Sequence, residues 1–311
     1  MPTTPDLRIR LGALSLKNPV LVASGTFGYG QEYAQYFDIA RLGAVVTKSL
    51  SLKPRAGNKP PRLVETPAGM LNAIGLQNVG VEAYIAEKLP FLRESGAEII
   101  ANIYGGGPEE YAELAQRLEQ ADAASAIEAN LSCPNVHDAR RTRGASMVAQ
   151  APEAIQEYTR VIRQATSLPL YVKLTPNVMD IREPALAAEE GGADAVALIN
   201  TLLGMAIDAE KRKPRLTNIV GGLSGPAIRP VAVKMVWDVS QVVGIPIVGI
   251  GGICTASDAV EFLLAGATAV TVGSMTFRQP DAPMRVLEGL EDYMNRHGIE
   301  SAGDLVGAME V

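Results

Sequence analysis

Eight short apolar segments, separated by amphipathic stretches, dominate the sequence. They are rich in Val, Ile and Ala and mostly do not alternate with polar residues, which is typical of strands buried on both faces of a parallel sheet. The segments are residues 20–23, 44–47, 98–101, 126–129, 170–172, 195–199, 247–249 and 269–272.

The stretches between these segments have the periodicity and end signals of helices. Residues 108–120, 152–165, 183–190, 227–242 and 256–264 are amphipathic, and several of them begin after Pro or Ser/Thr and end at Gly. Alternating strands and helices, with eight strands, predict one (β/α)8 TIM barrel over residues 1–311 as a single domain. A doubly wound open sheet is the alternative, but the glycine cluster at 249–254 lacks the third glycine of a dinucleotide-binding motif.

Three connections are too long for plain barrel loops, which usually have about 2–6 residues. They cover residues 48–80, 133–150 and 201–223. Long loops in a compact barrel commonly form lids or site walls. We therefore expect extra hairpins and long loops at the carboxyl-terminal face of the barrel.

Composition and charge exclude several classes of protein. The chain is 47% hydrophobic and carries a net charge of −6, which disfavours disorder and nucleic acid as a partner. Its two cysteines cannot supply the four thiolates of an iron–sulfur cluster. The longest nearly unbroken apolar run, residues 242–254, is shorter than the roughly 18 residues a membrane span needs. We expect a soluble, cytoplasmic protein.

Polar residues and glycines follow the predicted strands, at the end where barrel chemistry takes place. The glycines after the last two strands, with Ser274, suit a phosphate site because glycine lets backbone N–H groups approach an anion closely. Two tight turns are the alternative for these glycines. The residues that follow the strands are Ser24, Lys48, Asn102, Asn130, Lys173, Asn200, Gly251, Gly252, Gly273 and Ser274.

The two lysines and the asparagines in this set indicate the type of ligand. Lys48 and Lys173, pointing into one barrel mouth, would repel each other unless an anion or an electron-rich ring lay between them, as a reduced flavin would. Asn72, Asn130 and Asn200 carry donors and acceptors that match a planar ring with amide-like edges. The alternatives are surface charges for the lysines and turn caps for the asparagines.

Cys133 is the candidate catalytic residue. It follows the fourth predicted strand in a polar loop, where a thiol could act as a base that removes a C–H proton; a small buried hydrophobe is the alternative. Cys254 is predicted to be structural. Neither His137 nor His297 receives a role in proton transfer, and no cluster has metal-ligand spacing.

Several segments together resemble the class 1 dihydroorotate dehydrogenases, in the same order along nearly the whole chain. The sequences of residues 23–28 and 200–227 are most similar to those of the NAD-linked class 1B catalytic subunit. A membrane-bound class with a serine base is disfavoured by Cys133. The matching segments are residues 72–78, 130–136, 200–205, 221–227 and 248–253.

The resemblance implies FMN-dependent oxidation of dihydroorotate to orotate in pyrimidine synthesis. Cys133 would take the C5 proton, and the C6 hydride would pass to N5 of FMN. The implied substrate residues are Lys48, Asn72, Ala73, Ile74, Gly75, Leu76, Asn130, Asn200 and Thr201. The implied FMN residues are Ser24, Lys48, Ser49, Asn102, Asn130, Lys173, Ile199, Gly225, Gly251, Gly252, Gly273 and Ser274.

The resemblance also implies a partner. A homodimer of this chain would form the core of a heterotetramer with a subunit that carries FAD and a [2Fe–2S] cluster and passes electrons to NAD. The chain departs from the family pattern at residues 137–144, a longer stretch with three arginines. We expect these arginines either to lie in solvent or to face the anionic substrate.

Other functions remain open from the residues alone. Within flavin barrels, the alternatives are a fumarate-linked class 1A enzyme and an enzyme acting on another dihydropyrimidine, such as dihydrouracil. A barrel isomerase or aldolase would form a Schiff base with its substrate through Lys173. Such a function would leave the asparagines without a role. A non-catalytic scaffold would be expected to lack the polar residues at the strand ends.

Overall fold

The computed structural model describes residues 5–132, 148 and 151–310. Its centre is a closed barrel of eight parallel strands in the order β10-β15-β16-β3-β4-β7-β8-β9, which confirms the predicted fold. Each barrel strand falls on one of the predicted apolar segments. The strands are β3 (Val20–Val22), β4 (Ala44–Val46), β7 (Ile99–Ile103), β8 (Ala126–Asn130), β9 (Leu170–Lys173), β10 (Ala195–Leu198), β15 (Ile247–Ile250) and β16 (Ala269–Val272).

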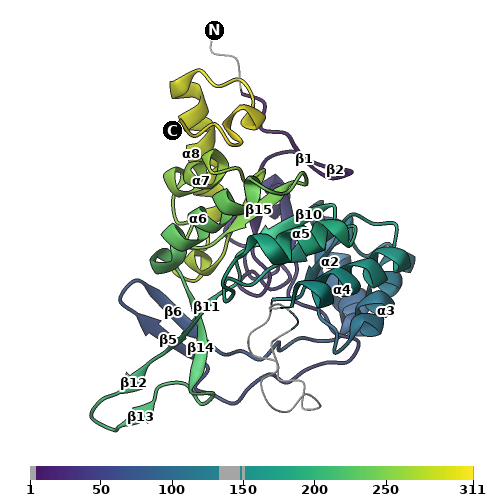
Figure 1. Ribbon diagram of the computed structural model, residues 1–311, viewed down its shortest axis with the longest axis vertical. Helices are drawn as coiled ribbons and strands as arrows, with labels where there is room; N and C mark the ends of the chain where they lie inside the picture. Colours follow the sequence, from purple (N-terminus) through teal and green to yellow (C-terminus); the bar gives the residue numbers. More distant parts are fainter. Residues whose placement is uncertain (1–4, 133–147, 149–150, 311) are drawn as a thin grey trace.

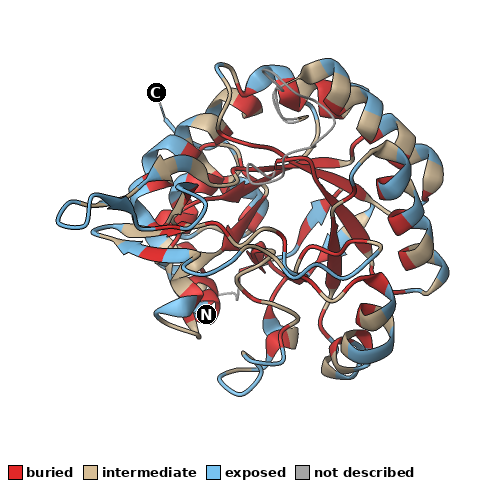
Figure 2. Cartoon of the chain, turned by 90° about the horizontal axis from the view of Figure 1, so that it is seen from below, coloured by how far each residue is buried: buried red, intermediate tan, exposed pale blue. Residues whose placement is uncertain are grey.

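Helices surround the barrel, as Figure 2 shows looking into it, with their buried faces turned toward the strands. Pro at the first position starts α3 and α4, and a capping box of Thr255 and Asp258 starts α7. The α-helices are α1 (Val81–Ala83), α2 (Leu89–Ser95), α3 (Pro108–Gln120), α4 (Pro152–Ala165), α5 (Arg182–Glu190), α6 (Arg229–Ser240), α7 (Ala256–Leu264) and α8 (Ala282–His297). Single turns are η1 (Ile39–Arg41), η2 (Tyr84–Lys88), η4 (Pro226–Ile228), η5 (Ser274–Phe277) and η6 (Ala302–Leu305).

A short hairpin lies at the amino-terminal end of the barrel. Its strands, β1 (Ile9–Leu11) and β2 (Leu14–Leu16), pair in antiparallel register through a turn in which Gly12 has φ +60°. The hydroxyl of Tyr171, in β9, donates a hydrogen bond of 3.1 Å to the carbonyl of Leu11. The hairpin therefore packs against the barrel strands, and it was not predicted from the sequence.

A four-stranded antiparallel sheet stands at the opposite end, away from the termini (Figure 1). The order β11-β14-β6-β5 combines two loops that are far apart in the chain, because β5 (Leu63–Thr66) and β6 (Gly69–Asn72) follow β4, whereas β11 (Leu202–Met205) and β14 (Val220–Ser224) follow β10. The small hairpin β12 (Ile207–Asp208) and β13 (Lys213–Pro214) extends beyond it. The expected extra hairpins at the carboxyl-terminal face are thus present.

One boundary changes the interpretation of a predicted site residue. Strand β7 extends to Ile103, so Asn102 lies inside the strand and not after its end. The predicted loop at 133–150 lies outside the described residues except for residue 148. Among the described residues, no helix is long and apolar enough to cross a membrane.

Candidate active site

A cavity of about 370 Å³ lies at the carboxyl-terminal ends of the barrel strands. Its volume is within the range of roughly 300–1,000 Å³ that is common for small-molecule sites. Most of the predicted site residues contribute to its lining, although they come from segments spread over the whole chain. These are Ser24, Lys48, Ser49, Asn72, Ile74, Gly75, Leu76, Asn130, Lys173, Ile199, Asn200, Thr201, Gly225, Gly251, Gly252, Gly273 and Ser274.

The described lining of this cavity is cationic. Lys48, Lys173 and Arg62 contribute to it, and no carboxylate from the described part of the chain does so. The protein as a whole has a net charge of −6, so the positive charge is local to the cavity. A concave surface of one sign raises the local concentration of ligands of the opposite sign. The cavity therefore favours an anionic ligand.

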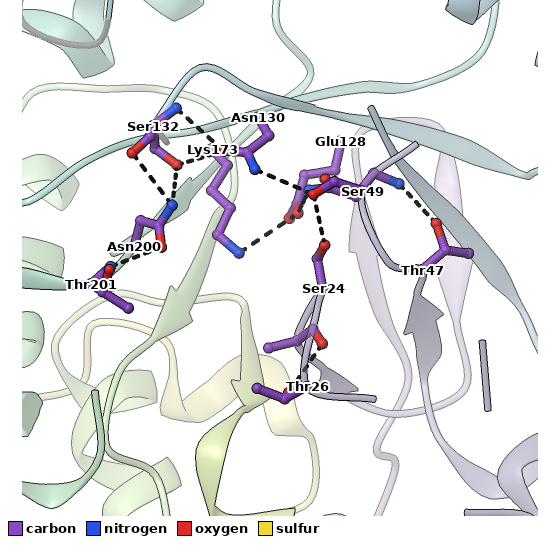
Figure 3. A network of polar contacts seen from close by, with 12 residues as sticks. Ser24, Thr26, Thr47, Ser49, Glu128, Asn130, Ser132, Lys173, Asn200 and Thr201 are labelled. Atoms are coloured by element: carbon purple, nitrogen blue, oxygen red, sulfur yellow. Dashed lines mark hydrogen bonds and ion pairs between the residues drawn. The ribbon is translucent and has the colours of Figure 1, made fainter. Parts of the chain in front are cut away.

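A chain of hydrogen bonds links the ends of β8 and β10 across the cavity (Figure 3). The Ser132 hydroxyl donates to Oδ1 of Asn130 at 2.8 Å and accepts from Nδ2 of Asn200 at 2.8 Å. The backbone N–H of Thr201 donates to Oδ1 of Asn200 at 2.8 Å. The hydroxyl of Tyr111, on α3, donates to the carbonyl of Asn130 at 2.7 Å. The orientations of both asparagines are therefore fixed by their neighbours.

A second set of polar contacts joins the first two barrel strands to β8. Asn130 Nδ2 donates to the Ser49 hydroxyl at 3.4 Å, and the hydroxyls of Ser49 and Ser24 are also 3.4 Å apart. Both bonds are long, so these serines retain capacity for a ligand. The Nζ atom of Lys48 lies close to Gly25, the residue after Ser24: a Cβ atom added to Gly25 would be 3.4 Å from this Nζ atom.

Lys173 lies in the cavity wall with a buried glutamate behind it. Its Nζ is 3.9 Å from Oε1 of Glu128, and both side chains are almost completely buried. The amide Nδ2 of Asn102 donates to the same Glu128 oxygen at 2.5 Å. The backbone N–H of Asn102 donates to the hydroxyl of Thr47 at 3.2 Å. Oδ1 of Asn102 is buried without a hydrogen-bond partner in the described structure.

The antiparallel sheet forms one wall of the cavity. Asn72, in β6, pairs with Gly222 of β14 and donates from Nδ2 to the Gly222 carbonyl at 3.2 Å. A Cβ atom added to Gly222 would lie 2.6 Å from Cβ of Thr201, closer than real Cβ atoms come to other atoms. Glycine at this position therefore allows the sheet to approach the Thr201 segment, and so brings Asn72 and Thr201 to the same cavity.

Glycines on the opposite side of the cavity allow the segment after β15 to pack closely against the segment that carries Gly225 and continues into α6. Gly252 has φ +74°, and an added Cβ would be 2.7 Å from the Gly225 carbonyl oxygen and 2.9 Å from Cβ of Arg229. At Gly251, with φ +140°, an added Cβ would be 2.7 Å from Cβ of Ala232. There is therefore no room for a side chain at either position. The backbone of these glycines lines the cavity as a small cradle, in which backbone N–H groups can approach an anion such as a phosphate.

Some of the predicted residues lie elsewhere. Asn102 and Ala73 are fully buried and are absent from the cavity lining; Ala73 packs in a small apolar cluster with Val64, Leu71 and Leu216. Cys133, His137 and the arginines at 140, 141 and 143 lie outside the described residues.

The structure also describes the other cysteine and the other histidine. Cys254 is half-buried, with its thiol 3.5 Å from the Gly252 carbonyl, and burial raises the pKa of that thiol. His297 is the last residue of α8. Among the described residues, no group of His, Cys, Asp and Glu side chains could hold a metal ion.

Four polar residues of the site were missed. Arg62 and Gln77 line the cavity and contact each other through a guanidinium–amide hydrogen bond. Ser132 and Glu128 hold other site residues in place. Glu128 was detectable, because it is a carboxylate inside an otherwise apolar strand segment, a position where a charge needs a partner. Ser132 lies in the segment that carried the resemblance, whereas Arg62 and Gln77 had no comparable signal.

Comparison with known proteins gives concordant matches. A family model described as "Dihydroorotate dehydrogenase" matches residues 7–294. Proteins named "Dihydroorotate dehydrogenase B (NAD(+)), catalytic subunit" are similar over nearly their whole length. The one from Geotalea daltonii is 52% identical over 99% of both chains, and that of Pelobacter propionicus is 54% identical over 98% of this chain and 99% of its own.

A solved structure shares the fold. The crystal structure of a DHODH from Eimeria tenella, in complex with ferulenol, covers 97% of this chain and 88% of its own, with a TM-score of 0.78 and 22% sequence identity. The overall fold of this chain is therefore one that occurs in another protein.

Proposed function

The chain belongs to the dihydroorotate dehydrogenase family, and from this premise we propose how it acts as the catalytic subunit of the NAD-linked enzyme, oxidising dihydroorotate to orotate in pyrimidine synthesis. The observation that carries the proposal is the cavity lining, with three cationic side chains and no carboxylate among the described residues. Orotate carries a carboxylate, and FMN carries a phosphate. A cavity that holds both must compensate two anionic groups.

The residues of the cavity fit FMN on two counts. The backbone of Gly251 and Gly252 lines the cavity as a cradle, and a side chain at either position would collide with neighbouring atoms. Lys48 and Lys173 supply positive charge for a ring system that becomes more negative when it is reduced.

We assign the FMN-binding residues as follows. Gly225, Gly251, Gly252, Gly273 and Ser274 would hold the phosphate through backbone N–H groups. Ser24, Ser49, Asn130, Ile199, Lys48 and Lys173 would contact the ring, with Asn102 behind it. When bound, FMN would supply the acceptor for the hydride that leaves C6 of dihydroorotate.

The substrate would lie against the asparagines and the antiparallel sheet. Asn72, Asn130 and Asn200 would orient the pyrimidine ring, because their amides can donate to its carbonyl groups and accept from its N–H groups. Thr201 and Lys48 would bind the carboxylate. Residues 73–76 would close the outer wall. Because the hydrogen bonds described above already orient these asparagines, little side-chain freedom would be lost on binding.

Cys133 is the proposed base. It directly follows Ser132, whose hydroxyl bridges Asn130 and Asn200. An unperturbed thiol has a pKa near 8.5, so a fraction of it is thiolate at neutral pH and can accept the C5 proton. Removal of that proton and of the C6 hydride forms the double bond of orotate.

Electrons must then leave the chain for NAD. The curated relatives are named as catalytic subunits of NAD(+) enzymes, which implies a further subunit in those proteins. We propose that this chain forms a homodimer within a heterotetramer whose other subunit carries FAD and a [2Fe–2S] cluster. The two cysteines of this chain could not bind such a cluster.

Turnover with different acceptors tests this assignment. We expect the chain alone to reduce its FMN with dihydroorotate but to reduce NAD slowly. Addition of a flavin and iron–sulfur subunit should raise the rate with NAD strongly, whereas fumarate should stay a poor acceptor. Rapid turnover of the chain alone with fumarate would contradict the assignment to the NAD-linked class.

A further inference from the structure

A carboxylate lies inside the barrel, although its strand is otherwise apolar. Glu128 is the third residue of β8, and its side chain is about 4% exposed. A buried charge is strongly unfavourable unless it is paired and hydrogen-bonded. The role of Glu128 therefore depends on the groups that surround it, which come from the two neighbouring strands.

The register of the strands places two polar partners around Glu128. Asn102 of β7 is its direct neighbour, and Lys173 of β9 is the neighbour of Asn130, two residues further along β8. Residues two apart in a strand share a face, so Glu128 is on the face of the sheet from which Lys173 reaches the cavity. Figure 3 shows the two side chains converging from adjacent strands.

The contacts of this carboxylate are unequal. Asn102 holds Oε1 by a hydrogen bond of 2.5 Å, whereas the Lys173 ammonium stays 3.9 Å from the same oxygen, outside hydrogen-bond range. Asn102 is itself held, since its backbone N–H donates to Thr47. The carboxylate is thus fixed by a neutral amide, and the ammonium remains at the cavity wall.

We propose that Glu128 is a positioning residue, which Asn102 holds as the fixed counter-charge of Lys173. The carboxylate makes burial of the ammonium tolerable and offsets part of its positive charge at the floor of the cavity. A further effect of Glu128 rests on the proposed function. By offsetting the charge of Lys173, Glu128 weakens the preference of Lys173 for the reduced, more negative FMN. Glu128 thereby lowers the reduction potential of the bound flavin.

The pair can be tested in the folded chain by a double-mutant cycle with Glu128→Gln, Lys173→Met and the double variant. Gln can still accept from Asn102, so Glu128→Gln removes the charge while the packing is kept. We expect it to lower the unfolding temperature by roughly 5 °C or more, because Lys173 loses its counter-charge. The double variant should recover most of that loss. Additive effects, or a double variant that fails to fold, would overturn the pairing.

The effect on the flavin needs a second measurement, by spectroelectrochemistry of the FMN-loaded chain. We expect Glu128→Gln to raise the two-electron reduction potential by at least about 30 mV, which corresponds to a tenfold change in the equilibrium between reduced and oxidised flavin. Glu98→Gln is the matched control, since Glu98 is a half-buried carboxylate just before β7, at the other end of the barrel, and should leave the potential unchanged.

The two measurements separate failure of this inference from failure of the proposed function. An unchanged or lowered potential in Glu128→Gln would overturn the electrostatic role of Glu128. A wild-type chain that binds no FMN would overturn the proposed function, whereas the unfolding cycle would still decide whether Glu128 and Lys173 act as a pair.

Discussion

Asn200, at the end of β10, donates a hydrogen bond of 2.8 Å from Nδ2 to the hydroxyl of Ser132, at the end of β8. The bond crosses the mouth of the barrel and joins two strands that are separated by β9. Ser132 also donates to Asn130, so one hydroxyl fixes two of the proposed substrate-binding amides. It directly precedes Cys133 in the chain, and therefore holds the start of the segment that carries the proposed base.

Ser132→Ala should weaken substrate binding. Asn130 Oδ1 and Asn200 Nδ2 would each lose a hydrogen bond of 2.8 Å and keep only the longer bonds, 3.3 and 3.4 Å, to the backbone of residue 132. Each lost hydrogen bond contributes about 0.5–1.5 kcal/mol. We expect the KM for dihydroorotate to rise about tenfold or more while FMN stays bound, measured by steady-state kinetics and flavin content. Ser240→Ala, which removes a hydroxyl that donates to the carbonyls of Trp237 and Ala265 away from the cavity, is the control. The same KM in both variants would count against this role.

Gly252→Ala should impair FMN binding. Its added Cβ would be 2.7 Å from the Gly225 carbonyl oxygen, so the phosphate loops must move apart. We expect the Kd for FMN to rise at least tenfold, measured by fluorescence titration of the apoprotein. Gly298→Ala is a matched control, because Gly298 has a similar φ of +65° but no atom within 4 Å of the added Cβ. The Gly298→Ala substitution should lower the free energy of unfolding by about 1 kcal/mol and leave the FMN affinity unchanged. Equal FMN affinities in the two variants would contradict the cradle.

Cys133→Ser should slow reduction of the flavin without loss of FMN. A serine hydroxyl is a far weaker base than a thiolate at neutral pH, and loss of a general base typically slows a reaction 10²–10⁴-fold. Anaerobic stopped-flow mixing with dihydroorotate measures the rate directly. Cys254→Ser provides the comparison, since the Cys254 thiol is half-buried beside Gly252 and its burial raises its pKa. Unchanged reduction by Cys133→Ser would remove this residue from the mechanism.

Tyr171→Phe should make stability less sensitive to alkaline pH. Burial raises the pKa of the Tyr171 hydroxyl above its usual value near 10, so its folded-state pKa exceeds the unfolded one. Its contribution is therefore complete below pH 10 and declines above it, by about 1.4 kcal/mol per pH unit until the folded-state pKa is reached. Urea unfolding between pH 9 and 11 should show a smaller decline for the variant than for the wild type. Identical declines would contradict this.

The fold could be predicted from the sequence because buried parallel strands leave a local signature. Each barrel strand overlaps one of the largely apolar segments, and helix α7 has both its start at Ala256 and its end at Leu264 as predicted. The antiparallel sheet could not be predicted in this way. Its strand β6 pairs with β14, and such long-range pairing between two loops has no local sequence pattern.

In the site, too, residues with a local sequence signal could be predicted, whereas those defined by pairing between strands could not. Lys173 and Asn130 were identified because a polar side chain directly after an apolar run stands out. Asn102 was placed after its strand because the polar residue was taken as the strand's end, whereas its amide is paired inside the barrel with Glu128. That pairing depends on the register of β7 and β8, which the sequence alone does not specify.

We propose that this cavity binds FMN and that the bound flavin receives hydride from a carboxylated dihydropyrimidine. Anaerobic titration of the purified, FMN-loaded chain, followed by flavin absorbance, examines both parts of this proposal. We expect dihydroorotate to bleach the flavin stoichiometrically and dihydrouracil, which lacks the carboxylate, to leave it oxidised. A chain that takes up no FMN, or one that dihydrouracil bleaches as readily as dihydroorotate, would contradict it.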